Sequence, residues 1–181
     1  MILSDSELVE MLREPRTRRE GFAVLVKQYS EKLYWKVRRI VLSHEDANDV
    51  LQNVFIKVWS NLQNFQGKSS LSTWLYRIAI NESLDFLRKQ KLADKVSADE
   101  DVSVASRLMS DEYFDGDEVQ ARLQEAVARL PEVQRTVFNL KYFEEMKYSE
   151  ISQILNTSEG ALKASYHLAV KKITEYLKRF N

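Results

Sequence analysis

The feature that most constrains the fold of this chain is its scarcity of glycine and proline. Only four glycines and two prolines occur in 181 residues, roughly a quarter of the usual share. Sandwiches and barrels of short strands need a turn about every 8–12 residues, and these two residues supply many such turns. The sequence therefore predicts an all-α protein.

Several site classes are excluded by what the sequence lacks. The absence of cysteine removes disulfides, thiolate metal sites and cysteine nucleophiles. The longest uninterrupted apolar run, Phe22 to Val26, is far shorter than the roughly 20 residues that span a bilayer. The first residues carry neither the basic nor the apolar stretch of a signal peptide. We expect no membrane insertion and a cytoplasmic location.

The net charge of zero is a cancellation between three segments. Residues 1–91 carry 15 basic and 11 acidic side chains, residues 92–118 carry 2 and 9, and residues 119–181 carry 10 and 7. A polar stretch this long is uncommon inside a compact domain. We therefore expect two domains, 1–91 and 119–181, joined by an acidic flexible linker, 92–118, with a short helical turn near Val104 to Met109. A solvated loop within a single domain is the alternative.

The N-terminal block predicts four helices. Apolar residues at steps of three and four mark helices over residues 3–12 and 22–40, a helix capped by Ser43 that extends to Leu62, and a helix from Thr73 to about Lys91. The loop between the last two contains one glycine and three serines. Trp59 and Trp74 stand at amphipathic positions, and we expect both in the core, with aromatic stacking platforms as the alternative.

Two of these helices present polar faces that core packing does not require. The third carries Asp49, Gln52, Asn53 and Lys57 on one side, and the fourth carries Arg77, Asn81, Asp85 and Arg88 at steps of four, four and three. An amide both donates and accepts hydrogen bonds, so an asparagine among arginines suits contact with nucleic-acid bases. An ordinary solvated face is the alternative.

The C-terminal block also predicts four helices. Apolar stripes begin at Val119 and at Val133, and Ser149 is expected to cap a short helix over residues 150–155. Asn156 suits a left-handed turn, and Ser158 caps a long helix with Tyr166 turned inward. The outer face of that helix carries Lys163, His167, Lys171 and Lys178. This order predicts a helix-turn-helix, and an ordinary helical hairpin is the alternative.

No arrangement of residues indicates catalysis. His44 and His167 lack metal-ligand spacing, and the Gly67-Lys68-Ser69 string lacks the upstream glycine and strand of a phosphate-binding loop. Asp46 and Asp49 stand near a helix N-terminus, where the helix dipole favours carboxylates. We expect no enzymatic activity, no metal and no cofactor.

Four strings, in order, resemble the extracytoplasmic-function (ECF) group of bacterial sigma factors, the promoter-recognition subunits of RNA polymerase. They are DANDVLQNVFIKVW at 46–59, FQGKSSLSTWLYRIAIN at 65–81, LPEVQRTVFNLKY at 130–142 and YSEISQILNTSEGALK at 148–163. The resemblance covers residues 20–91 and 119–178. It implies a protein that binds core RNA polymerase and directs it to promoters through their −10 and −35 elements.

The resemblance implies three sets of site residues. The docking face, which contacts the clamp helices of the largest polymerase subunit, is Asp46, Asp49, Gln52, Asn53 and Lys57. The −10 face, which receives melted DNA and a flipped base, is Lys68, Ser69, Ser70, Arg77, Asn81, Asp85 and Arg88. The −35 face is Ser158, Lys163, Ser165, Tyr166, His167 and Lys171. An anti-sigma factor that covers these faces is implied as a further partner.

This chain departs from the family pattern in two places. Asn53 stands where the family commonly has a glutamate after the docking glutamine, which reduces the docking charge. The last helix has Lys163-Ala-Ser-Tyr-His-Leu-Ala where members often carry arginines. The guanidinium that would bind guanine with two hydrogen bonds is missing, so the resemblance predicts that α-helical docking in the groove is kept but does not predict the preferred −35 bases.

Two other functions remain open from the residues alone. A helix-turn-helix regulator would bind duplex DNA tightly without polymerase, but it leaves residues 20–91 unexplained. A helical adaptor would bind only protein and make no DNA contact even when polymerase is present.

Overall fold

The computed structural model describes residues 3–93 and 116–180, and all of its regular elements there are helices. The chain divides into two compact units, residues 1–95 and 96–181. This confirms the predicted two-domain, all-α fold, and the division falls within the predicted linker. The helical turn predicted near Val104 lies outside the described residues. No helix in the described ranges is long and apolar enough to cross a membrane.

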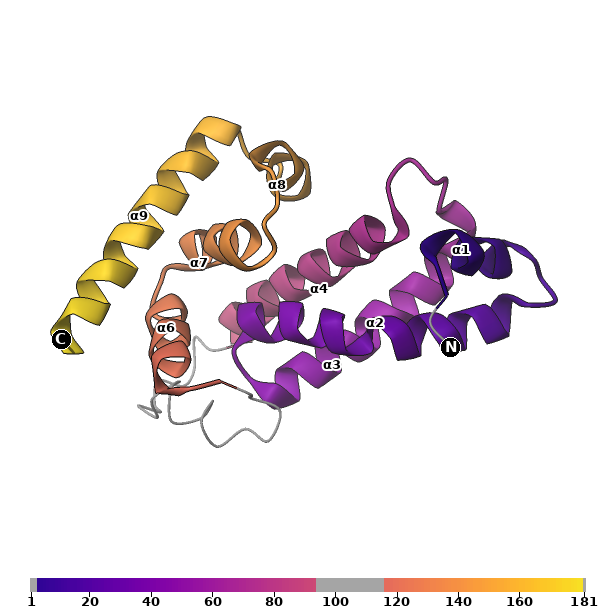
Figure 1. Cartoon of the computed structure of the whole chain (residues 1–181), viewed down its shortest axis with the longest axis horizontal. Helices are drawn as coiled ribbons and strands as arrows, with labels where there is room; N and C mark the ends of the chain where they lie inside the picture. The colour runs from indigo at the N-terminus through magenta and orange to yellow at the C-terminus, as the bar shows by residue number, and fades with distance from the viewer. Residues whose placement is uncertain (1–2, 94–115, 181) are drawn as a thin grey trace. The chain divides into compact units, whose positions relative to one another are not determined.

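The N-terminal unit is a bundle of three long helices with a short helix against it (Figure 1). Its elements are α1 (Asp5–Arg13), α2 (Arg18–Val41), α3 (His44–Asn61), a 3₁₀ turn (Leu62–Asn64) and α4 (Leu71–Ala93). The α2, α3 and α4 helices contact one another, and α1 packs mainly on α2. Fully buried aliphatic residues, such as Leu33, Val54 and Leu75, form the core.

Local sequence signals determine where most of these helices begin and end. Ser4 and Glu7 form a capping box at α1, and the Asp46 N–H donates to the Ser43 hydroxyl at α3 over 3.3 Å. Helix α2 begins four residues earlier than predicted. There Arg18 Nε donates to the Leu12 carbonyl over 3.0 Å, and a Cβ added at Gly21 would lie 2.8 Å from Met11 Cβ. Both contacts hold the first turn of α2 against α1.

The described part of the C-terminal unit combines short helices of 7 to 11 residues with one long helix of 19 residues and two shorter segments. They are α6 (Glu118–Ala128), α7 (Glu132–Phe138), one π-helical segment (Asn139–Phe143), α8 (Tyr148–Leu155), α9 (Glu159–Leu177) and a 3₁₀ turn (Lys178–Phe180). Its core joins α6, α7 and α9 through the buried residues Ala126, Val127, Leu130, Phe138, Ala169 and Ile173.

The α8–turn–α9 segment has the predicted helix-turn-helix order. Asn156 is left-handed, with φ of 50°, and the Ala161 N–H donates to the Ser158 hydroxyl over 3.3 Å. The prediction that Ser149 caps α8 is wrong. The helix begins at Tyr148, because the Glu150 carboxylate accepts from the Lys147 N–H over 2.8 Å and moves the cap two residues back.

Three apolar residues expected in cores are exposed instead. Val119 is 72% exposed and Val133 is 60% exposed, since both lie on the outer sides of their helices. Trp59 is 41% exposed, although its ring packs edge-on against Phe22 with centroids 5.0 Å apart. Trp74 is half-buried against Phe65. Helical spacing alone therefore predicted more buried residues on these helices than the structure contains.

Candidate functional site

The outer side of α3 brings together most of the predicted docking face. Asp49, Gln52 and Asn53 are exposed on successive turns, and Asp46 is half-buried in the first turn. The N-terminus of α3 is held by His44, whose ring nitrogens lie 2.7 Å from the Tyr34 hydroxyl and 3.0 Å from the Asn48 amide nitrogen. The first turn of α3 is therefore held by side-chain contacts, and the exposed carboxylate and two amides follow it along the helix.

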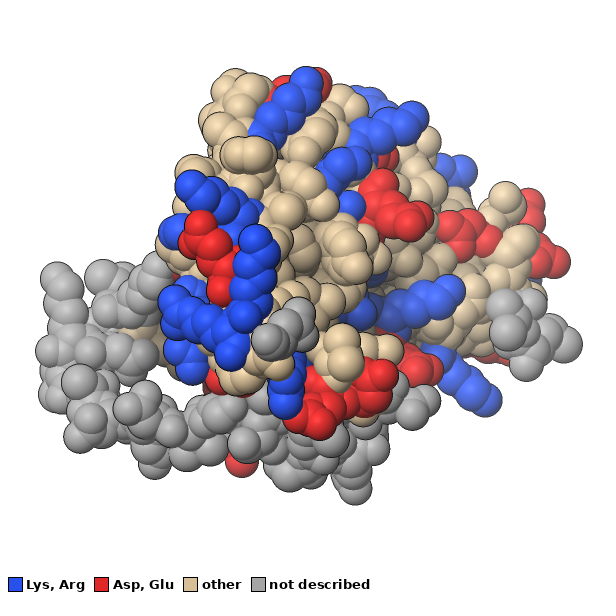
Figure 2. All heavy atoms as spheres, turned by 60° about the vertical axis from the view of Figure 1, so that its left-hand side comes forward, with Lys and Arg blue, Asp and Glu red and all other residues tan. Residues whose placement is uncertain are grey.

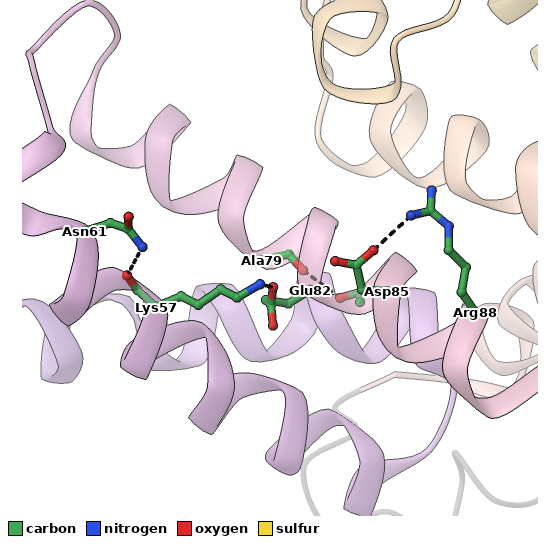
Figure 3. A network of polar contacts seen from close by, with 7 residues as sticks. Lys57, Asn61, Ala79, Glu82, Asp85 and Arg88 are labelled. Carbon is green, nitrogen blue, oxygen red and sulfur yellow. Dashed lines mark hydrogen bonds and ion pairs between the residues drawn. The ribbon is translucent and has the colours of Figure 1, made fainter. Parts of the chain in front are cut away.

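Lys57 differs from the rest of the docking face because its ammonium points towards α4. It forms an ion pair with Glu82, whose side chain is only 13% exposed (Figure 3). The Asn61 amide donates to the Lys57 carbonyl over 2.8 Å at the end of α3. The pair thus links the helix that carries the docking face to the helix that carries the −10 face.

The predicted −10 face of α4 combines an exposed amide with a paired charge. Asn81 is exposed, and Arg88 Nη1 lies 2.9 Å from the Asp85 carboxylate (Figure 3). Arg77 is half-buried, and its Nε is buried with no hydrogen-bond partner among the described residues. Arg88 is thus paired with a carboxylate, whereas the Asn81 amide is exposed on the same helix.

The loop before α4 contains the serines of the predicted −10 face, and one of them, Ser70, caps the helix. The Ser70 hydroxyl accepts from the Thr73 N–H over 3.1 Å and donates to Thr73 Oγ1 over 2.8 Å. Ser70 therefore starts α4. Lys68 is exposed and Ser69 is half-buried, while Gly67 is left-handed, with φ of 70°, a conformation that glycine adopts without strain.

A basic stripe on α2 was not singled out in the sequence. It consists of Lys32, Lys36 and Arg39 at steps of four and three. The Lys36 ammonium lies 4.0 Å from the centre of the Tyr76 ring on α4. Burial, followed by the charges of Arg39 and Lys32, lowers the pKa of Lys36 to about 8. The spacing of the three cations was the signal that would have found them.

The −35 face of α9 separates into exposed and packed members. Lys163, His167 and Lys171 are exposed along one side, whereas Ser165 is half-buried. Ser158 is occupied as the cap of α9. Val170, 39% exposed, lies three residues beyond His167 on the same side and was missed because only polar residues were considered.

Two aromatic residues organise this face. The Tyr166 ring stacks on Phe138 at 5.8 Å and packs against Tyr148 at 6.5 Å, so it belongs largely to the core. The Lys163 ammonium lies 5.7 Å from the centre of the Tyr148 ring, and Lys141 lies on the same ring at 5.1 Å. Burial raises the pKa of the Tyr148 hydroxyl, and both cations contact the face of its ring.

Basic and acidic side chains both lie on the face of the molecule drawn in Figure 2. Figure 2 shows lysine and arginine side chains in groups, with acidic side chains beside and among them. The described residues contain no group of three or more histidine or acidic side chains that could hold a metal ion. Because basic and acidic side chains are mixed, binding to an anionic partner would depend on small groups of basic side chains.

Comparison with family models matches the two units in order. Residues 25–93 match Sigma-70 region 2, and residues 120–173 match Sigma-70, region 4. The ECF RNA polymerase sigma factor SigW of Bacillus subtilis is 32% identical over 168 residues, which cover 88% of this chain and 90% of SigW. The RNA polymerase sigma-H factor of Pseudomonas aeruginosa is 31% identical over 182 residues and covers 96% and 93%.

Two solved structures share the fold. The sigma factor RpoE in complex with the anti-sigma factor NepR from Bartonella quintana matches with a TM-score of 0.69 and 21% identity, covering 88% of this chain and 98% of that one. CnrH in complex with the cytosolic domain of CnrY matches with a TM-score of 0.66 and 20% identity, covering 98% and 96%.

Proposed function

Since the chain belongs to the ECF group of RNA polymerase sigma factors, we propose that its two units divide promoter recognition between them. The N-terminal unit docks on core polymerase and binds the melted −10 element, and the C-terminal unit binds the −35 element as duplex. The observation that carries this proposal is that each unit presents one helix, α4 or α9, with an exposed polar face.

The docking contact is assigned to the exposed strip of α3. Asp49, Gln52 and Asn53 would meet the clamp helices of the largest subunit, with Asp46 at the edge of the contact. One carboxylate and two amides favour a partner that offers hydrogen-bond donors and positive charge. Lys57 is bound to Glu82, so its contribution to docking is expected to be small.

The −10 contact is assigned to α4 and the loop before it. Asn81 would hydrogen-bond an exposed base edge, while Arg77 and Lys68 would neutralise phosphates and Ser69 would line the pocket for a flipped base. Taking a base out of the stack costs a few kcal/mol, which favours easily unstacked steps. Asp85, Arg88 and Ser70 would support this face through the contacts they already make.

The −35 contact is assigned to α9. Lys163 and His167 would face the major groove, with Lys171 on phosphate and Val170 against a thymine methyl group. Ser158 fixes the start of the helix. Ser165 and Tyr166 are assigned to packing and to the edge of the groove contact, because both are half-buried.

The protein is expected to act in the cytoplasm, without catalysis of its own and without a cofactor. The polymerase supplies the chemistry of RNA synthesis, so this chain needs only to bind and to position DNA. Regulation by an anti-sigma factor that covers the docking and DNA faces is supported by the two structural neighbours, each solved with a bound partner.

A run-off transcription assay with core polymerase and genomic fragments tests the proposal. The chain should start RNA synthesis at a subset of fragments only when core polymerase is present. Tight binding of an operator by the isolated protein would instead support a helix-turn-helix regulator. An absence of DNA contact even with polymerase would support a protein-only adaptor.

A further inference from the structure

We propose that the basic stripe of α2, Lys32, Lys36 and Arg39, binds successive phosphates of the DNA strand that α4 recognises. This inference rests on the proposed function, because it adds a second contact surface to the same N-terminal unit. It assigns DNA binding to α2, a helix whose sequence pattern indicated only a buried apolar stripe.

The geometry of the stripe fits a row of phosphates. Lys32, Lys36 and Arg39 lie on one face because their spacing follows the helical period. Seven residues of helix cover about 10 Å at 1.5 Å per residue. Phosphates of one strand are about 3.4 Å apart along the axis of a duplex and further apart in an extended single strand, so the stripe is long enough for at least two of them.

The stripe lies beside the −10 face. Helices α2 and α4 pack together in the N-terminal bundle (Figure 1). The Lys36 ammonium lies 4.0 Å from the centre of the Tyr76 ring on α4, and Tyr76 directly precedes Arg77 in the sequence. Neighbouring residues of a helix are about 100° apart, so the stripe lies to one side of Arg77, where a strand that contacts Arg77 could bend round α4 to meet it.

Aromatic rings hold two of the three cations in place. Lys36 lies over Tyr76, and the Lys32 ammonium lies 5.9 Å from the centre of the Tyr29 ring. A cation over a ring face is attracted by the ring quadrupole. Such lysines lose less freedom when they bind a phosphate than lysines that extend freely into solvent.

The charges of the stripe make an anion favourable there. Burial, then Arg39 and Lys32, lowers the pKa of Lys36 to about 8, and burial lowers the pKa of Arg39. A bound phosphate favours the charged form of a nearby lysine, so phosphate binding and protonation of Lys36 reinforce each other.

Lys36 is the group of this cluster whose pKa lies between pH 7 and 9. Burial, then contact with Asp5 of α1, raises the pKa of Tyr29, and burial followed by the Asp5 charge raises the pKa of Tyr76. Both phenols therefore stay neutral over this range, and Arg39 stays charged. A bound phosphate raises the pKa of Lys36, so DNA affinity falls as the pH rises through 8.

The experiment measures holoenzyme binding to the non-template single strand of a promoter fragment that the wild-type holoenzyme transcribes. Fluorescence anisotropy is recorded at pH 7, 8 and 9 and over a range of salt concentrations. The variants are Lys36→Met, which removes the charge, and Lys36→Arg, which keeps a charge that does not titrate. Lys27→Met is the matched control, because Lys27 is exposed on α2 but about half a turn from the stripe.

We expect wild-type affinity to fall about fivefold between pH 7 and 9. Lys36→Arg should keep the pH 7 affinity and lose the fall. Lys36→Met should bind about fivefold more weakly at pH 7, with a salt slope smaller by about 0.7, the value of one single-strand phosphate contact. Lys27→Met should behave as wild type.

Two results would overturn the inference. One is a Lys36→Met variant with wild-type affinity, salt slope and pH profile. The other is a variant that loses affinity for core polymerase while keeping affinity for DNA, which would show that the stripe faces an acidic protein surface. A wild-type chain that transcribes no fragment would contradict the proposed function instead, so the two failures are distinguishable.

Discussion

The two helices assigned to DNA recognition use the same periodic spacing but different chemistry. On α4 an exposed amide, Asn81, stands beside an arginine that a neighbouring carboxylate neutralises. On α9, Lys163, His167 and Lys171 are exposed, and Lys163 lies on a tyrosine ring. An amide suits the edges of unpaired bases, whereas exposed cations suit the phosphates and groove of duplex DNA. The difference therefore matches single-strand recognition by one unit and duplex recognition by the other.

The largest expected effect comes from opening the core of one unit only. Leu75→Ala removes a fully buried side chain of α4 and should destabilise the N-terminal unit by about 2–5 kcal/mol. Amide resonances of α1–α4 should shift or broaden, while those of α6–α9 stay in place. Equal loss of both sets would show that the two units do not fold independently.

The second prediction separates recognition from docking within the N-terminal unit. Asn81→Ala removes the exposed amide of α4 and should lower −10-dependent melting about tenfold, since an unpaired base edge loses its partner. Core affinity should stay within about twofold. Permanganate reactivity of promoter thymines measures the melting, and a polymerase binding assay measures the affinity for core polymerase.

Gln153→Ala, which removes an exposed amide of α8, is its control and should change neither quantity. If Asn81→Ala reduced melting and core affinity by the same factor, the assignment of Asn81 to bases would be wrong.

The third prediction concerns α9. Lys163→Ala should weaken −35 binding about fivefold and lower the salt slope by about one, because a cation near the phosphates is lost. Lys163→Arg keeps the charge and should retain most of the affinity. A footprint over the −35 element that Lys163→Ala leaves unchanged would remove the assignment.

The smallest expected effect is at the ion pair between α3 and α4. Lys57→Glu or Glu82→Lys should each destabilise the N-terminal unit by about 1 kcal/mol, because each places like charges together beside a partly buried site. The double variant should recover most of that loss in a denaturant titration. Loss of core affinity in Lys57→Ala without loss in Glu82→Ala would instead restore Lys57 to the docking face.

Much of the fold was predictable because local signals agree with the tertiary structure. The caps at Ser4, Ser43 and Ser158 and the left-handed Asn156 depend on side chains within a few residues. The failures concern helix starts and apolar residues that face outward, and the start of α8 was missed although the contact between Lys147 and Glu150 is local. Gly21 packs closely against Met11 in the first turn of α2, which begins before the apolar pattern does, and Val119 and Val133 are exposed, although their spacing resembles that of core residues.

The sequence by itself determined the helical class, the order of the helices and which residues share each helix face, because these follow from turn chemistry and a fixed period of 3.6 residues. Only the tertiary structure decided how those faces are used. It turned Lys57 towards Glu82, stacked Tyr166 on Phe138 and placed Lys36 over Tyr76. Each of these contacts joins two elements, and a side chain's charge and hydrogen bonds depend on the element it meets.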